Sequence, residues 1–242
     1  MPKTFFNWSS GKDAALALYL LQSASEYQID KLVTTVNTDF DRVSMHGLRA
    51  SLLRKQAENI GLPLMEIALS GNTSMEAYSQ IMDSAYAKLK GEGFMQSVYG
   101  DIFLEDLREY RDRNLAKADI EGIYPLWKKD TSELANQIID LGFKAIIVTT
   151  SDKLLGKDFC GRNYDLEFIA DLPATVDPCG ENGEFHTFVY DGPIFKNPVD
   201  FKKGEIVLRD SAGAEKENVN WETAFWYCDL KEISHSFTDG KN

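Results

Sequence analysis

Short apolar segments alternate with longer segments of helical periodicity through the first half of the chain. Strands are predicted where apolar or β-branched residues are contiguous, over residues 4–7, 32–36, 63–69 and 97–100. Helices are predicted where apolar residues recur every three or four positions, over residues 12–21, 48–60 and 78–89. This alternation predicts an α/β fold, in which helices connect the strands of a parallel sheet by right-handed crossovers.

The pattern changes near Pro125. A helix is predicted from a cap at Asp130 to Leu141, and a strand over residues 145–150. Shorter apolar stretches then stand between polar loops, at residues 185–190, 206–208 and 221–227. We therefore expect a first domain over residues 1–124, a smaller α+β domain over 125–235, and a frayed polar tail over 236–242.

Charge and composition narrow the classes of partner. The 242 residues include 38 acidic and 26 basic side chains, a net charge of -12, which disfavours nucleic acid as the main partner. No apolar run reaches the roughly 18 to 20 residues that cross a bilayer, so no membrane is expected. Three scattered cysteines, without a CxxC pair or a signal peptide, point to a reducing cytoplasm and no disulfides.

The turn Ser9–Asp13 is the first candidate ligand site, because it follows the first strand and opens the first helix. Backbone N–H groups and the helix dipole favour an anion there, and a bound phosphate would explain Lys12 in a first turn where a cation is otherwise unfavourable. The Walker A spacing fails, since Phe6 stands where its first glycine belongs. An ordinary polar turn is the alternative.

Ligands of parallel sheets bind at the carboxyl ends of strands, which directs attention to two more places. Asn37 follows the second strand, and Gly100-Asp101 follows the fourth. Asp101 and Asp13 are candidate Mg²⁺ ligands, because Mg²⁺ takes hard oxygen donors; a capping role is the alternative for Asp101. His46 is a candidate nucleotide contact, with a loop or cap role as its alternative.

Several motifs, in order along nearly the whole chain, resemble one enzyme family. Ser9–Ala14 resembles the SGGKDS loop of the PP-loop ATP pyrophosphatases, the adenine-nucleotide α-hydrolase superfamily, with Ser10 and Ala14 as departures. Five further segments resemble motifs of the diphthine–ammonia ligase family within it: His46-Gly47 with Gln56–Glu58 and Gly61–Leu64, Gly100–Ile102, Pro125–Trp127, Leu155–Arg162, and Asp177–Thr187 with Asp191–Pro193.

The resemblance implies a fold and a reaction. The first domain would be a Rossmann-like domain that binds ATP with Mg²⁺. The enzyme would adenylate a carboxylate, release pyrophosphate, and couple ammonia to give an amide and AMP. The acceptor would be a small molecule or a modified protein side chain, and a homodimer is compatible with the family. Nucleotide contacts would come from Ser9, Ser10, Gly11, Lys12, Asp13, Asn37, His46, Gly100 and Asp101.

The loop between Cys179 and Thr187 is the candidate catalytic segment. Glu181, Asn182, Glu184 and His186 stand there around two glycines. The resemblance implies that they bind ammonium and accept its proton, with His186 as a proton shuttle. It also implies that the loop reaches the nucleotide site. A plain hairpin turn is the alternative, since Asn-Gly is a strong turn signal. Cys179 is expected to be a buried thiol rather than a nucleophile.

Two other functions remain compatible with the residues. One is an adenine-nucleotide sensor, which the altered residues Ser10 and Ala14 keep open. The other is an RNA-modifying PP-loop enzyme, which the acidity and the lack of zinc-type cysteine clusters disfavour. The aromatic residues Trp221, Phe225, Trp226 and Tyr227 could stack on bases, but core packing is the expected role.

Overall fold

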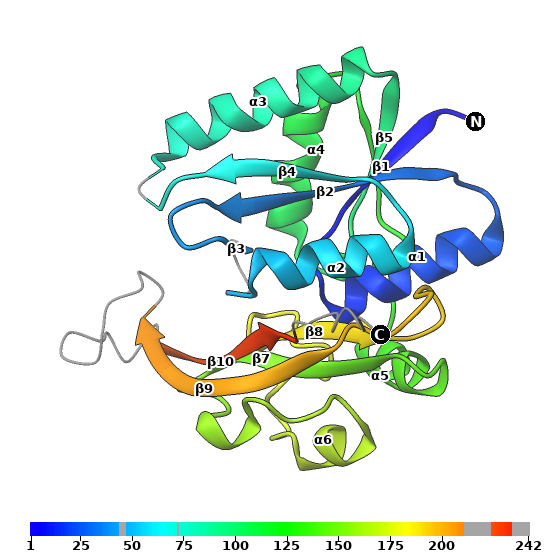
Figure 1. The fold of residues 1–242 in the computed structure, drawn as a ribbon. Coiled ribbons are helices and arrows are strands. Elements are labelled where there is room, and N and C mark those ends of the chain that lie inside the picture. The colour runs from blue at the N-terminus through cyan, green and yellow to red at the C-terminus, as the bar shows by residue number, and fades with distance from the viewer. Residues whose placement is uncertain (44–46, 72, 211–223, 234–242) are drawn as a thin grey trace, which may run out of the picture.

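A computed structural model describes residues 1–43, 47–71, 73–210 and 224–233. Two sheets organise the chain, and helices separate them (Figure 1). This confirms the α/β fold with a second, smaller sheet domain. The expected domain boundary between residues 124 and 125 stays a proposal. The expected tail, residues 236–242, lies outside the described residues.

The first sheet has five parallel strands in the order β4-β2-β1-β5-β6, and the short β3 pairs antiparallel with the end of β2. Its elements are β1 (Lys3–Asn7), α1 (Lys12–Ala24), β2 (Ile29–Asn37), β3 (Arg42–Val43), α2 (Ala50–Ile60), β4 (Leu64–Leu69), α3 (Met75–Gly91), β5 (Phe94–Val98), α4 (Glu105–Lys117) and β6 (Glu121–Ile123).

The second sheet is antiparallel, in the order β8-β7-β10-β9. Its elements are α5 (Thr131–Asp140), β7 (Lys144–Ser151), a 3₁₀ turn η1 (Lys157–Phe159), α6 (Leu166–Asp171), β8 (Phe185–Asp191), β9 (Phe201–Asp210) and β10 (Ala224–Glu232). Trp221, expected in the last strand, lies outside the described residues.

Layers follow from the apolar faces of these elements. Helices α3 and α4 cover one face of the first sheet, and α1 and α2 lie between the first sheet and the second (Figure 1). One cluster of buried side chains fills the layer around α1 and α2, and another lies beneath α3 and α4. Helix α1 is buried along most of its length, because it contacts a sheet on both sides. Residues at the carboxyl ends of β1 and β5 line one cavity with residues 179–183, which precede β8.

Local signals set the end of α2 and the start of α5 where the sequence predicted, whereas α1 runs on to Ala24, beyond the predicted Leu21. Gly61 takes φ +83° and donates its N–H to Ala57, which closes α2. Asp130 caps α5 by accepting the Glu133 N–H at 3.0 Å. Helix α4 and strand β6 were not predicted, because α4 is strongly polar and buries only Leu115 fully. No described helix combines the length and apolarity needed to span a bilayer.

Candidate active site

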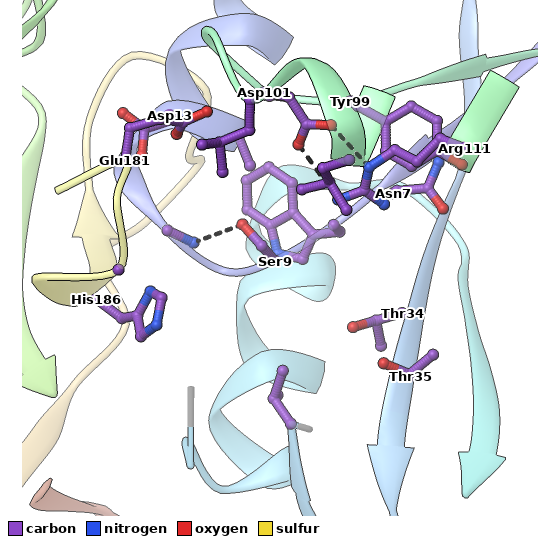
Figure 2. A pocket seen from close by; sticks show the side chains of 18 of the residues that line it. Asn7, Ser9, Asp13, Thr34, Thr35, Tyr99, Asp101, Arg111, Glu181 and His186 are labelled. Atoms are coloured by element: carbon purple, nitrogen blue, oxygen red, sulfur yellow. Dashed lines mark hydrogen bonds and ion pairs between the residues drawn. The ribbon is translucent and has the colours of Figure 1, made fainter. Parts of the chain in front are cut away.

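A cavity of about 780 Å³ opens at the carboxyl edge of the first sheet and is lined from both halves of the chain. Figure 2 shows Asp13, Glu181, Asp101 and Arg111 around it, with His186 at the second sheet's side. The predicted residues among its lining are Ser9, Gly11, Lys12, Asp13, Gly100, Asp101, Glu181, Asn182 and His186.

Three predicted residues do not line the cavity, and a fourth is not described. Ser10 and Glu184 are buried behind the cavity wall. Asn37 lies at the end of β2, where its Oδ1 accepts the Asp39 N–H at 3.0 Å, and it does not line the cavity. His46 lies outside the described residues. A direct nucleotide contact of Ser10, Asn37 and His46 stays a prediction, and the cavity geometry does not support it for Ser10 and Asn37. The catalytic role expected of Glu184 also stays a prediction.

The turn Ser9–Asp13 is fixed from behind. Ser10 has φ +72°, a left-handed conformation that glycine adopts more readily, and glycine stands there in the SGGKDS loop. Its carbonyl accepts from Val189 N at 3.0 Å and from Gln56 Nε2 at 3.1 Å. The turn thus keeps the backbone shape of a glycine turn although Ser10 replaces the glycine.

The first turn of α1 offers N–H donors to the cavity. The Lys12 N–H donates to Thr187 Oγ1 at 3.1 Å. The N–H groups of Asp13 and Ala14 have no acceptor within the part of the chain that the structure describes. Unpaired N–H groups at a helix start, beside the positive end of the helix dipole, suit an anion.

Lys12 is buried in the wall, with 2% of its side chain exposed. Its Nζ lies 2.9 Å from Asp13 Oδ2, donates to the Cys179 carbonyl, and sits 5.2 Å from the ring centroids of Tyr164 and Phe185. Burial lowers the pKa of Lys12, but Asp13, Cys179 and Glu181 together outweigh burial and the net pKa is raised. The ammonium therefore stays charged and joins the two halves of the chain; its contact with phosphate stays a prediction.

Asp101, just after β5, faces Arg111 of α4 rather than open solvent. Arg111 Nη2 donates to Asp101 Oδ1 at 3.3 Å. Arg111 Nε lies 2.7 Å from Oδ2, a buried ion contact that lacks hydrogen-bond alignment. Burial raises the pKa of Asp101, against the lowering effect of Arg111.

The segment 177–187 reaches the edge of the first sheet. Glu181 Oε1 accepts the N–H groups of Ile102 at 2.8 Å and Phe103 at 3.4 Å. Burial raises the pKa of Glu181 to about 7, helped by the nearby charges of Asp13 and Asp101. Glu181 can therefore gain or lose a proton near neutral pH.

The other polar residues of this segment have different surroundings. Glu184 is buried, and its Oε1 accepts from Asp177 N at 3.1 Å and from Asn182 Nδ2 at 3.0 Å, so it shapes the loop from behind. Burial, and then the charge of Lys12, lower the pKa of His186 to about 4. His186 is thus neutral at pH 7 and poorly suited to the proton shuttle expected from its ordinary pKa.

The expectation of a buried thiol at Cys179 agrees with the structure, whereas the expectation that the aromatic residues pack in the core agrees only in part. Cys179 is a buried free thiol, and burial raises its pKa far above the ordinary value. Trp226 is half-buried and packs against the core, and its Nε1 donates to Asp152 Oδ1. Phe225 does line the cavity, from the start of β10.

Sequence reasoning missed a whole wall of the cavity. Arg111 and its neighbours on α3 and α4 line it together with residues of β1 and β2 and the residue after β5, namely Asn7, Thr34, Thr35, Tyr78, Met82, Tyr99, Leu107, Tyr110 and Asn114. The strand-end rule could have found Asn7, which ends β1. No motif flagged Arg111, because α4 itself was not predicted.

The described residues do not form a protein-held metal centre: none of their His, Cys, Asp and Glu side chains gather in threes or more around a metal position. The two expected ligands, Asp13 and Asp101, are each paired with a cation, Lys12 and Arg111. A divalent ion at this edge would need most of its ligands from phosphate and water.

Comparisons with known proteins agree along the chain. Residues 2–117 match the family model of the diphthamide synthase N-terminal domain, and residues 130–235 that of the diphthamide synthase C-terminal domain. Similar curated proteins are the diphthine–ammonia ligases of Danio rerio (28% identical over 168 residues, 63% of this chain and 66% of that protein) and Mus musculus (28% over 172 residues, 64% of each). The matches span just under two thirds of these relatives' length.

One solved structure, described as a predicted subunit of tRNA methyltransferase from Methanocaldococcus jannaschii, superposes with a TM-score of 0.41 at 16% identity. It covers 60% of this chain and 80% of that chain. A likeness this distant says nothing about activity.

Proposed function

Since this chain belongs to the diphthamide synthase family, we propose that it is an ATP-dependent ligase that joins ammonia to a carboxylate and releases AMP and pyrophosphate. The relatives are named for diphthine. For this chain the acceptor is taken only as a carboxylate, on a small molecule or a modified protein side chain. The observation that carries the proposal is the shared cavity, where the turn Ser9–Asp13 and the loop 177–187 meet.

ATP phosphates would bind at the start of α1. The open N–H groups of Asp13 and Ala14 and the Ser9 side chain line this part of the cavity. Mg²⁺ fits here only as a partner of the phosphates. Asp13 and Asp101 offer the hard oxygen ligands that it prefers, but each carboxylate would have to bind the ion together with the cation it already pairs with, Lys12 or Arg111. When bound, the ion would neutralise phosphate charge beside these carboxylates.

The reaction would run in two steps. A carboxylate oxygen attacks the α-phosphorus, forming the acyl-adenylate while pyrophosphate leaves. Ammonia then attacks the acyl carbon, the C–N bond forms, and the C–O bond to AMP breaks. The attacking nitrogen loses a proton in this second step, and a base with a pKa near the working pH is the most effective acceptor.

Glu181 is the best-placed group for that proton. Its carboxyl lines the cavity, and its pKa is about 7. The charged carboxylate can therefore hold ammonium, and it becomes the neutral acid when it accepts the proton. Together with Asp13 and Asp101 it makes this corner attractive to a cation such as ammonium. Asn182 and Glu184 would position the loop, and His186 would act as a neutral hydrogen-bonding group.

The test is incubation of the protein with ATP, Mg²⁺, ammonium and a metabolite pool, with chromatography of the nucleotide products. AMP with pyrophosphate supports the ligase, and ADP as main product contradicts it. Glu181→Gln should retain ATP binding and lose about 100- to 10,000-fold in AMP formation. ATP binding without any turnover would instead favour the nucleotide sensor.

A further inference from the structure

The wall between α3 and α4 has no role in the reaction steps above. It carries one cation, Arg111, among partly exposed apolar and aromatic side chains (Tyr78, Met82, Leu107 and Tyr110), and one acid, the exposed Asp83 of α3. Asn114 adds an amide from the next turn of α4. An organic ligand with one anionic end and an apolar body matches such a wall.

Arg111 differs from Lys12, the other cationic side chain among the described residues of the lining. Lys12 is enclosed by Asp13, a carbonyl and two aromatic rings. Arg111 is 29% exposed and uses only its Nε and Nη2 edge toward Asp101. The Nη1 and Nη2 end of the guanidinium has no further acceptor among the residues that the structure describes, and it forms a fork that fits both oxygens of a carboxylate.

The guanidinium is held in place before any ligand binds. Its Cζ lies 4.3 Å from the ring centroid of Tyr99, and Tyr99 stacks on Tyr124 with centroids 5.5 Å apart. Arg108 lies 4.6 Å from the rings of both Tyr124 and Trp127. Tyr99, which follows β5, and the segment 124–127 thus meet at one stack of rings and guanidinium groups, and that stack fixes the direction of Arg111.

We propose that Arg111 binds the carboxylate of the acceptor, whose apolar or aromatic body lies between α3 and α4. This inference rests on the proposed ligase function. Asp101 already balances the positive charge of Arg111, so a single carboxylate charge suits the site better than a triphosphate, whose several charges would lie against Asp101. Figure 2 shows Asp101 between Asp13 and Arg111. An acid bound at Arg111 would therefore lie beside the turn Ser9–Asp13, the phosphate turn, which is named for the ATP phosphates proposed to bind it.

The same contact separates substrate from product. A carboxylate accepts two N–H bonds from the guanidinium, whereas the amide product is neutral and presents its own N–H donors to it. Arg111 would therefore hold the acid and release the amide.

The proposal is tested by the binding of two probes to the full chain, measured by ligand-observed NMR. The acid probe is 3-phenylpropionate, and 3-phenylpropionamide is its neutral counterpart. Wild-type protein should bind the acid saturably and at least about tenfold more tightly than the amide. Arg111→Lys keeps a charge for Asp101, so it should fold, yet it loses the fork and should lose about tenfold in affinity for the acid. Arg113→Gln, at an exposed position of the same helix, is the matched control and should bind like wild type.

ATP titration of the same variants separates the two possible anions. Unchanged ATP affinity in Arg111→Lys supports the carboxylate site. The proposal is overturned if wild type does not distinguish acid from amide, if Arg111→Lys binds the acid as wild type does, or if its ATP affinity falls instead, which would assign Arg111 to nucleotide phosphate. AMP formation by wild type is a separate result: its absence would remove the ligase and leave a carboxylate site at Arg111 standing.

Discussion

At the scale of single residues, surroundings rather than residue type decide which group of the cavity can exchange a proton. Glu181 lies among other carboxylates and is largely enclosed, so its pKa rises from 4.5 to about 7. His186 lies in a buried place near the Lys12 ammonium, so its pKa falls from 6.5 to about 4. The sequence could place both residues in the loop but not assign these roles, because burial and neighbouring charges come from the other half of the chain.

The two shifts have opposite consequences for stability. Between pH 4.5 and 7 the folded state keeps a Glu181 proton that the unfolded chain releases, so this group lowers stability as pH rises. Between pH 6.5 and 4 the unfolded chain takes up a His186 proton that the folded state refuses, so this group lowers stability as pH falls. In wild type the two slopes oppose each other over the shared window of pH 4.5–6.5.

Single substitutions should therefore tilt the pH dependence in opposite directions. Glu181→Gln should make the free energy of unfolding rise more steeply with pH in that window, and His186→Asn should make it fall, each by at most about 1.4 kcal/mol per pH unit. Urea denaturation at several pH values from 5 to 6.5 measures this. Curves that stay parallel to wild type would mean that neither pKa is shifted in the folded protein.

Ser10 allows a test of backbone strain. At φ +72° a side chain costs roughly 1 kcal/mol that glycine avoids. Ser10→Gly should therefore be more stable than Ser10→Ala by about that amount, with both lacking the hydroxyl. Ala17→Gly, in the middle of α1, should show the reverse order and lose about 1 kcal/mol or more. Equal stability of the two Ser10 variants would show that the turn relaxes out of the left-handed region.

At the scale of elements, amphipathic or β-branched segments were predictable and α4 was not. Strand β7 and helix α2 carry their burial pattern in the sequence, because one face or the whole segment is apolar. Helix α4 has charged residues around most of its surface and packs mainly through Leu115 and through arginines on aromatic rings. Hydrophobic periodicity cannot reveal that mode of packing, so the Arg111 wall of the cavity was missed with it.

Gly100 shows how two elements approach at the site. A Cβ at this position would lie 2.9 Å from Ala14 N and 3.1 Å from Ala14 Cα, both backbone atoms of α1. Gly100→Ala should push the end of β5 from the start of α1, cost about 1 to 3 kcal/mol, and weaken ATP binding by covering the Ala14 N–H. Calorimetric titration with ATP and urea denaturation measure the two effects.

Gly91 is the matched control for that substitution. A Cβ there meets no atom within 4 Å, and the residue ends helix α3. Gly91→Ala should leave ATP affinity unchanged and be neutral or stabilising by up to about 1 kcal/mol. Similar losses in both variants would show that the close approach at Gly100 does not exist in solution.

At the scale of the whole molecule, the order of motifs indicated that distant segments share one site, but not how they are joined. The joining contacts are single side chains that no pattern singles out. Gln56 of α2 is buried; its Nε2 donates to Ser10 O at 3.1 Å and to Val189 O at 2.5 Å, and its Oε1 accepts from Trp8 Nε1 at 2.9 Å. Asp229 of β10 joins the halves differently, by ion pairs to Arg42 and Arg49 near the surface.

The Gln56 hydrogen bonds and the Asp229 ion pairs should respond differently to substitution. Gln56→Leu keeps the volume but removes three hydrogen bonds and leaves the Trp8 indole N–H and the Val189 carbonyl without partners, at about 1 to 3 kcal/mol for each orphaned group. It should also weaken ATP binding, because the Ser10 carbonyl that fixes the phosphate turn loses a donor. Asp229→Asn removes partly exposed ion pairs, so it should cost about 1 kcal/mol or less and leave ATP affinity intact. Urea denaturation with ATP titration on both folded variants decides: if Gln56→Leu behaves like Asp229→Asn, the direct bonds from Val189 N to the Ser10 carbonyl and from Lys12 N to Thr187 Oγ1 are enough to hold the turn Ser9–Asp13.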